Sequence, residues 1–178
     1  MKIMLNGLPS SGKDTVANYL SFYYGFKKLA FADGIYQIAE DYFGMLKKDR
    51  QLLRDIGEKL REIDENVWVK NTFKQGELYE NVVITDCRRD NEYDEGIKRG
   101  YKPIKITMNE DKRLKLLEKR DGKLDTSLTE CETQAYDREY FEIENNNELA
   151  SLIIQIDWIM EKHGIEKIRE VSRGGKLD

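Results

Sequence analysis

Cysteine and histidine are scarce in this sequence, and their scarcity excludes several kinds of site. The 178 residues include two cysteines and one histidine. Cys87 and Cys131 form no C-x-x-C pair and have no histidine nearby, so reduced thiols are favoured over a disulfide or a zinc site. His163 is expected at the surface, near the end of the last helix. A surface position near a helix end essentially excludes a triad built on this histidine, and a lone histidine essentially excludes a histidine metal cluster.

Long apolar runs and an excess of basic residues are also absent. No apolar stretch approaches the ~20 residues that span a bilayer, and the N-terminus lacks the form of a signal peptide. We therefore expect a cytoplasmic protein without a membrane partner. The net charge of -4 argues against bulk nucleic-acid binding, although it leaves room for local basic patches. The length is enough for one domain with a substantial core.

One glycine-flanked stretch, residues 7–15 (GLPSSGKDT), lies between a short apolar run and an amphipathic segment. In such a loop the backbone N–H groups point at an anion, the helix N-terminus adds partial positive charge, and the lysine reaches the outer phosphates. Gly7, Gly12 and Lys13 fit the usual pattern G-x-x-x-x-G-K-[ST], but Asp14 takes the hydroxyl position and Thr15 comes one later. The stretch predicts a phosphate cradle; a strand–helix turn without a ligand is the alternative.

Short apolar runs alternate with amphipathic segments along the whole chain, which predicts an α/β protein with a mainly parallel sheet covered on both faces. The expected strands are Lys2–Asn6, Lys28–Ala32, Asn81–Thr85, Lys102–Met108 and Phe141–Ile143. The expected helices are Lys13–Tyr23, Ile35–Phe43, Gln51–Ile63, Glu65–Phe73, Asn91–Lys98, Asp111–Lys119 and Leu149–Met160. In the helix from Gln51, the residues expected on the buried side are Leu52, Leu53, Ile56, Leu60 and Ile63.

Acidic residues follow two of the predicted strands, at the sheet edge where parallel α/β proteins bind ligands. Asp33 follows the second strand, and Asp86 follows the run Val82–Ile84. Asp86 is placed to hold a magnesium ion through water; the alternative is that it only caps the next helix. Arg88 and Arg89 follow it after Cys87 and are placed to clamp a phosphate, although surface charges are the alternative.

A polar, charged segment at about 111–136 predicts a lid that closes over the site. Its positive charges would neutralise a phosphoryl group in transfer. Such a run of charges most often forms a solvent-exposed helix face. Beside a phosphate cradle, however, a position on a lid over the site is favoured for Arg113 and Arg120. The basic residues are Lys112, Arg113, Lys115, Lys119, Arg120 and Lys123.

Taken together, these motifs resemble the phage-type deoxynucleoside monophosphate kinases, within the P-loop nucleoside monophosphate kinase group. The resemblance implies a single three-layer P-loop kinase domain with a mainly parallel five-stranded sheet, acceptor-binding helices at about 34–75 and a lid. It covers most of the chain in order. The matching segments are SGKDT with Val16-Ala17, Phe31–Asp33, Leu52–Gly57 with Arg61 and Trp68–Lys70, Ile84–Asp94, Asp125–Glu130 and Ile143–Asn145.

The resemblance implies transfer of the ATP γ-phosphoryl group to a (deoxy)nucleoside monophosphate, with magnesium. Lys13, Arg88, Arg113 and Arg120 would be catalytic. The ATP site would comprise Gly7, Pro9, Ser10, Ser11, Gly12, Lys13, Asp14, Thr15 and Asn145. The acceptor site would comprise Asp33, Arg54, Arg61, Trp68 and Arg88. Trp68 would be a stacking surface; the alternative is a core position, which is more common for a buried tryptophan on a helix. The magnesium site would comprise Asp14 or Thr15, with Asp86. A homodimer is a candidate assembly.

The sequence departs from this family where the acceptor would bind. Gly34 and Tyr36 stand where the family commonly has Pro and Lys, and Ser127 stands where it commonly has His. The loop's GKD form also occurs in animal-type phosphomevalonate kinases, and dephospho-CoA kinases are more distant relatives. A kinase of a non-nucleotide small molecule therefore stays open, with Asp33 as a base for an alcohol acceptor. So does a non-catalytic nucleotide-binding module.

Overall fold

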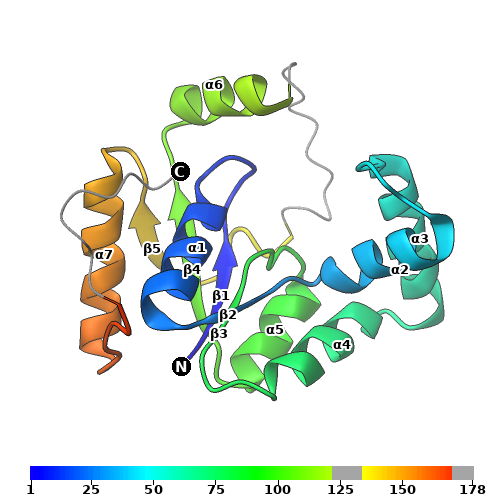
Figure 1. The fold of residues 1–178 in the computed structure, drawn as a ribbon, viewed down its shortest axis with the longest axis horizontal. Coiled ribbons are helices and arrows are strands. Elements are labelled where there is room, and N and C mark those ends of the chain that lie inside the picture. The colour runs from blue at the N-terminus through cyan, green and yellow to red at the C-terminus, as the bar shows by residue number, and fades with distance from the viewer. Residues whose placement is uncertain (122–133, 170–178) are drawn as a thin grey trace.

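The computed structural model describes residues 1–121 and 134–169, which form an α/β fold around one five-stranded sheet (Figure 1). Every strand pair is parallel, in the order β2-β3-β1-β4-β5. The strands are β1 (Lys2–Asn6), β2 (Lys27–Leu29), β3 (Val82–Ile84), β4 (Lys102–Thr107) and β5 (Phe141–Glu144). The helices are α1 (Lys13–Tyr24), α2 (Asp33–Phe43), α3 (Arg50–Ile63), α4 (Val67–Gly76), α5 (Asp90–Lys98), α6 (Glu110–Asp121) and α7 (Leu149–Lys162).

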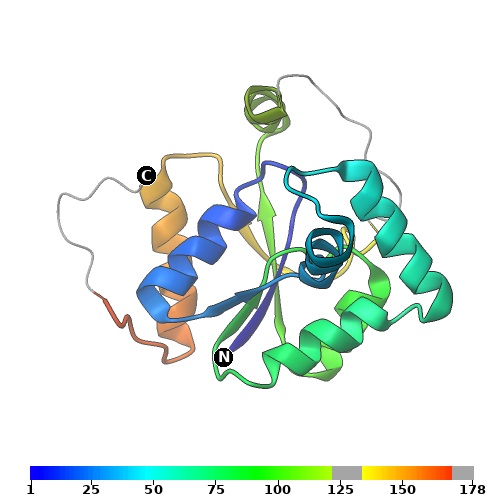
Figure 2. The same ribbon diagram turned by 45° about the vertical axis from the view of Figure 1, so that its right-hand side comes forward.

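Helices cover both faces of the sheet, which gives the three layers visible in Figure 2. Successive side chains of a strand point to opposite faces. Ile3 and Leu5 accordingly pack with α1 and α7, whereas Met4 packs with α4 and α5. Both faces are apolar, as expected for a parallel sheet buried between helices. This confirms the fold class predicted from the alternating segments.

A smaller apolar cluster lies outside the two main cores and joins α2, α3 and α4. Its buried members are Ile35, Ala39, Ile56 and Trp68. In Figure 1, α2 and α3 project to one side of the sheet, while α6 lies above the carboxyl ends of the strands. These elements therefore flank the edge at which parallel α/β sheets bind ligands.

The predicted elements are all present, and the differences have local causes. The second strand ends at Leu29 rather than Ala32, because the next backbone N–H groups leave the ladder for carboxylates: that of Ala30 donates to Asp33 at 2.7 Å and that of Phe31 to Asp86 at 2.7 Å. The placement of Ile63 on the buried side of its helix is wrong. It is the last residue of α3 and 82% exposed, past the end of the packed surface.

One of the two cysteines and the histidine lie in the described part of the chain. Cys87 is a buried free thiol, and burial raises its pKa well above the usual value. Cys131 lies outside the described residues. His163 is exposed and directly follows α7, as predicted. Within residues 1–121 and 134–169, no helix combines the length and the apolar character that crossing a membrane requires.

Candidate functional site

The loop between β1 and α1 has a backbone that only its glycines allow. Gly7 has φ 148°, and a side chain there would place Cβ 2.5 Å from the Ile106 carbonyl oxygen. Gly12 has φ 105°, and a Cβ would collide with the Asn145 side-chain amide. Ser10 also has a positive φ, 65°. The loop is therefore wedged between β4 and the segment after β5, in a conformation that excludes larger residues at both glycines.

The start of α1 fits an anion. No side chain caps its N-terminus, so its first N–H groups have no side-chain acceptor. Among the described residues, the buried Ser11 hydroxyl also has no hydrogen-bond partner. Asp14 and Thr15 are exposed in the first turn. The phosphate chain of a nucleotide would accept hydrogen bonds from polar groups of this kind.

Lys13 folds back onto the loop. Its Nζ donates to the carbonyl oxygens of Gly7 at 2.7 Å and Leu8 at 3.0 Å. The pKa of Lys13 is lowered to about 8, first by burial and then by the positive charges of Arg88 and Arg120. The carboxylates of Asp14 and Asp86 act in the opposite direction. A phosphate group at the loop would add negative charge and so favour the protonated lysine.

Two further segments hold the loop from outside. Asn145, after β5, donates its side-chain N–H to the Ser11 carbonyl oxygen at 3.0 Å. Arg113 is buried on α6, and its Nη1 donates to the Pro9 carbonyl oxygen at 3.4 Å. Arg120 lies exposed on the last turn of α6. The predicted lid motif Asp125–Glu130, with Ser127, and Lys123 lie outside the described residues.

Asp86 joins the ends of two neighbouring strands. Its two carboxylate oxygens accept the backbone N–H groups of Phe31 at 2.7 Å and Ala32 at 3.1 Å. Burial raises its pKa, while Arg88 and these two hydrogen bonds lower it. Asp86 does not cap α5, which disposes of the alternative considered from the sequence. It holds the residues that lead into Asp33, itself exposed at the first position of α2.

The α5 N-terminus is capped instead by Glu92, which the sequence analysis did not single out. Its Oε2 accepts the backbone N–H groups of Arg88 at 2.8 Å and Arg89 at 3.0 Å. This fixes the backbone of both arginines. A glutamate three residues after the N-cap residue is a known signal for a helix N-terminus. Arg89, the N-cap residue here, is not of a type that typically caps helices.

Buried Glu92 predicts a pH-dependent stability. Burial, followed by the charge of Asp86, raises its pKa from 4.5 to about 7. The native carboxyl therefore keeps its proton up to about pH 7, whereas the unfolded one releases it near its usual pKa. That contribution to stability is complete below the unfolded pKa and is lost as pH rises through the native one.

Between about pH 5 and about pH 8, we expect the free energy of unfolding to fall by about 2–3 kcal/mol more in the wild-type protein than in Glu92→Gln. Glutamine can still accept both N–H groups but does not titrate. Urea denaturation of both proteins across this range measures the difference. Parallel curves would contradict a raised pKa at Glu92.

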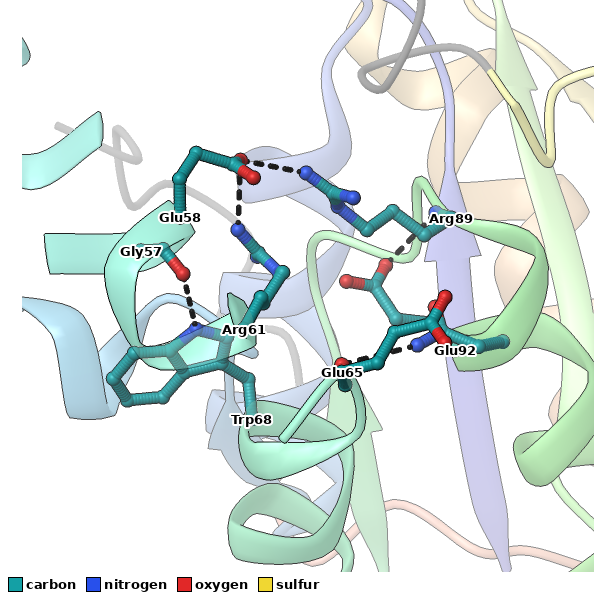
Figure 3. Close-up of polar contacts among 8 residues, drawn as sticks. Gly57, Glu58, Arg61, Glu65, Trp68, Arg89 and Glu92 are labelled. Carbon is teal, nitrogen blue, oxygen red and sulfur yellow. Dashed lines mark hydrogen bonds and ion pairs between the residues drawn. The ribbon is translucent and has the colours of Figure 1, made fainter. Parts of the chain in front are cut away.

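A second basic group lies on the other side of the strand ends, between α3 and α5 (Figure 3). Glu58 Oε1 accepts hydrogen bonds from Arg61 Nη1 at 3.0 Å and from Arg89 Nη2 at 2.8 Å. The arginine side chains are 16% and 18% exposed, and that of Glu58 is 49% exposed. Arg54, also predicted for the acceptor site, lies exposed on α3. Sequence reasoning missed Glu58 because no local pattern places it against Arg89.

Trp68 occupies a different position from the one predicted. It is buried in the α2–α3–α4 cluster, and its Nε1 donates to the Gly57 carbonyl oxygen at 3.1 Å (Figure 3). Its ring is therefore part of a core rather than a stacking surface. It fixes α4 against α3 directly beside Glu58.

Several predicted site residues meet at one edge of the sheet. Asn6, at the end of β1, donates to the Cys87 carbonyl oxygen at 2.6 Å, and the Cys87 N–H donates to the Leu5 carbonyl oxygen at 3.1 Å. These bonds bring Asp86 and Arg88 beside the loop that carries Lys13. Over the described ranges, no three His, Cys, Asp or Glu residues form a metal cluster. Magnesium in phosphoryl-transfer sites typically takes one or two carboxylates and substrate phosphates, so Asp86 and the first turn of α1 fit that chemistry.

Comparisons with known proteins agree with this architecture. A search of curated proteins finds no match. Protein TT1252 from Thermus thermophilus has a TM-score of 0.60 and 16% identity, over 91% of this chain and 97% of that one. An unliganded sugar kinase from Janibacter sp. HTCC2649 has a TM-score of 0.51 and 16% identity, over 92% and 94%. At such identities the likeness shows a P-loop kinase-like fold. A model described as "AAA domain" matches residues 3–142, well over half of the sequence, and the chain therefore belongs to the AAA domain family.

Proposed function

We propose that this protein transfers the γ-phosphoryl group of ATP to a (deoxy)nucleoside monophosphate. The observation that carries the proposal is the presence of two separate cationic groups around one sheet edge. Lys13 and Arg113 lie at the glycine-flanked loop, while Arg61 and Arg89 lie between α3 and α5. A donor phosphate chain accounts for the first group, and a phosphate on the acceptor accounts for the second.

On the donor side, the loop and the start of α1 bind the phosphate chain. Magnesium-ATP, when bound, supplies the transferable phosphoryl group and the charge of the metal. Lys13 neutralises the outer phosphates, and Arg113 and Arg120 from the proposed lid, 111–136, stabilise the charge in transfer. Asp86 and one of the two exposed α1 residues, Asp14 or Thr15, would hold the magnesium ion.

On the acceptor side, residues 34–75 of α2, α3 and α4 hold the nucleoside monophosphate. Arg61 and Arg89 bind its phosphate, together with Arg88. Arg54 and Asp33 are exposed and line the approach. The acceptor phosphate is already anionic, so this reaction needs positioning and charge neutralisation more than a general base. Trp68 contributes indirectly, by fixing α3 against α4.

The direct test is ADP release from magnesium-ATP with each common nucleoside and deoxynucleoside monophosphate. We expect turnover with at least one of them, at the roughly 1–100 per second typical of kinases. Asp33→Asn should retain most of this activity, because no base is required. ATP binding without turnover of any acceptor would instead indicate a nucleotide-binding module.

A kinase of a non-nucleotide alcohol or phosphate, such as phosphomevalonate, is the second candidate. It is favoured by exposed Asp33 at the strand-end edge and by Gly34 and Tyr36, which depart from the resembled family. In that case turnover would require a non-nucleotide acceptor and would collapse in Asp33→Asn. Assays of nucleotide and of non-nucleotide acceptors, each with the wild-type protein and Asp33→Asn, therefore distinguish the two proposed functions.

A further inference from the structure

The carboxylate of Glu58 lies where an acceptor phosphate would bind. A single oxygen, Oε1, receives one N–H group from Arg61 on the same helix and one from Arg89, directly before α5 (Figure 3). A phosphate monoester between the same two guanidinium groups would present three oxygens and about two negative charges. The chemistry that recognises Glu58 is therefore the chemistry that recognises a phosphate monoester.

We propose that Glu58 is an internal competitor for the acceptor's phosphate, which must displace its carboxylate from between Arg61 and Arg89. The proposal deepens the proposed function and rests on it for the identity of the acceptor. Glu58 then sets the affinity of this subsite and its selectivity. A dianionic phosphate ester can replace the carboxylate, whereas a weakly held monoanion cannot.

The two arginines are anchored much more firmly than the glutamate. The Arg89 backbone is fixed by Glu92, and its side chain and that of Arg61 are mostly buried. The backbone beside Glu58 is fixed as well, because Trp68 bonds to the Gly57 carbonyl oxygen. Only the half-exposed Glu58 side chain has solvent to rotate into. Ligand entry therefore requires one side-chain rotation, with the arginine pair already in place.

The energies allow this exchange. An ion pair with a half-exposed partner contributes about 0–1 kcal/mol, because solvent screens it and ordering two long side chains costs entropy. A charge-assisted, multidentate arginine–phosphate contact is stronger. The bridge by Glu58 is thus strong enough to orient the guanidinium groups and to compete measurably, but too weak to exclude a phosphate ester.

Binding of inorganic phosphate tests the proposal without using catalysis. Calorimetric titrations are run with the protein saturated with ATP in EDTA, so that the donor loop is filled. We expect phosphate to bind about 5–10-fold more tightly to Glu58→Gln than to the wild-type protein, since about 1 kcal/mol of competition is removed. Arg89→Ala should lose this binding and so identifies the subsite.

Glu62→Gln is the matched control. It removes the same charge from the same helix, but Glu62 pairs with exposed Lys59 at 2.7 Å. Its phosphate affinity should stay within about 2-fold of wild type, which separates local competition from a general change in charge. Melting temperatures of all variants check folding, and Glu58→Ala gives a second variant should glutamine disturb α3.

The outcomes separate the two proposals. Unchanged or weaker phosphate binding in Glu58→Gln and Glu58→Ala would make Glu58 a structural bridge and overturn the competitor role. Absence of ATP binding would instead overturn the proposed function. The phosphate binding that is lost in Arg89→Ala would still be measurable by titration, so Glu58 competition would be tested independently. In turnover assays, Glu58→Gln should lower the acceptor KM with kcat unchanged, as expected for uniform binding.

Discussion

Replacement of Lys13 by alanine is expected to reduce phosphoryl transfer on the order of 10³-fold while leaving the fold intact. The Lys13 ammonium group donates to two loop carbonyl oxygens, at 2.7 and 3.0 Å, and the residue belongs to none of the apolar clusters of the described residues. Its removal therefore takes a positive charge from the phosphate cradle without opening the core. Steady-state ADP release measures the loss, and far-ultraviolet circular dichroism with thermal melting measures the fold.

Lys28→Ala is a suitable control for this experiment. Lys28 lies exposed on β2 and donates to the Asn18 side-chain oxygen at 2.6 Å, away from the cradle. Its replacement should leave transfer within about 2-fold of wild type, as is usual for exposed positions. Loss of helical signal in Lys13→Ala would make this lysine structural. If Lys13→Ala transferred the phosphoryl group at the wild-type rate, the loop at residues 7–15 would have no part in the reaction.

Replacement of Asp86 by asparagine is expected to lower both stability and activity. The carboxylate accepts two backbone N–H groups, those of Phe31 and Ala32. An asparagine offers only one acceptor oxygen, and its amide N–H₂ would face the other donor. We expect the free energy of unfolding to fall by about 2 kcal/mol, measured by urea denaturation. Loss of a carboxylate that would hold the magnesium ion should reduce transfer about 10²-fold.

Asp33→Asn provides the comparison, because Asp33 is exposed and accepts one N–H group, that of Ala30, at 2.7 Å. Its cost in unfolding free energy should stay below about 1 kcal/mol. If Asp86→Asn unfolds like the wild-type protein, the two hydrogen bonds do not hold the strand end. If stability is retained but transfer is lost, and excess magnesium restores it, Asp86 acts through the metal alone.

Local sequence periodicity was sufficient to predict the helices and strands, but it did not predict where some of them end. The 3.6-residue and two-residue periodicities follow from backbone geometry, so α1 and β1 were predicted nearly to the residue. The end of β2 was not, because it depends on the carboxylate of Asp86, more than fifty positions further along the chain. The burial of Ile63 was overestimated, because periodicity does not tell where the packed surface of α3 stops.

The candidate acceptor region shows the same division. A tryptophan among helical residues is compatible with both a stacking surface and a core, and only the packing of α2, α3 and α4 placed Trp68 in the core. Glu58 carried no signal at all. Its contact with Arg89, 31 positions further along the chain, exists because the fold brings α3 close to the residue that precedes α5.

The sequence by itself determined the proposed donor side of this protein. The cradle is contiguous, and its shape follows from the dihedral freedom of Gly7 and Gly12 and from the strand and helix that flank them. Tertiary structure alone decided the proposed acceptor side, because β3 pairs with β1 and thereby brings Arg88 and Arg89, which precede α5, to the edge that holds Lys13. Strand order and helix packing arise from burial summed over the whole chain, which no local motif encodes.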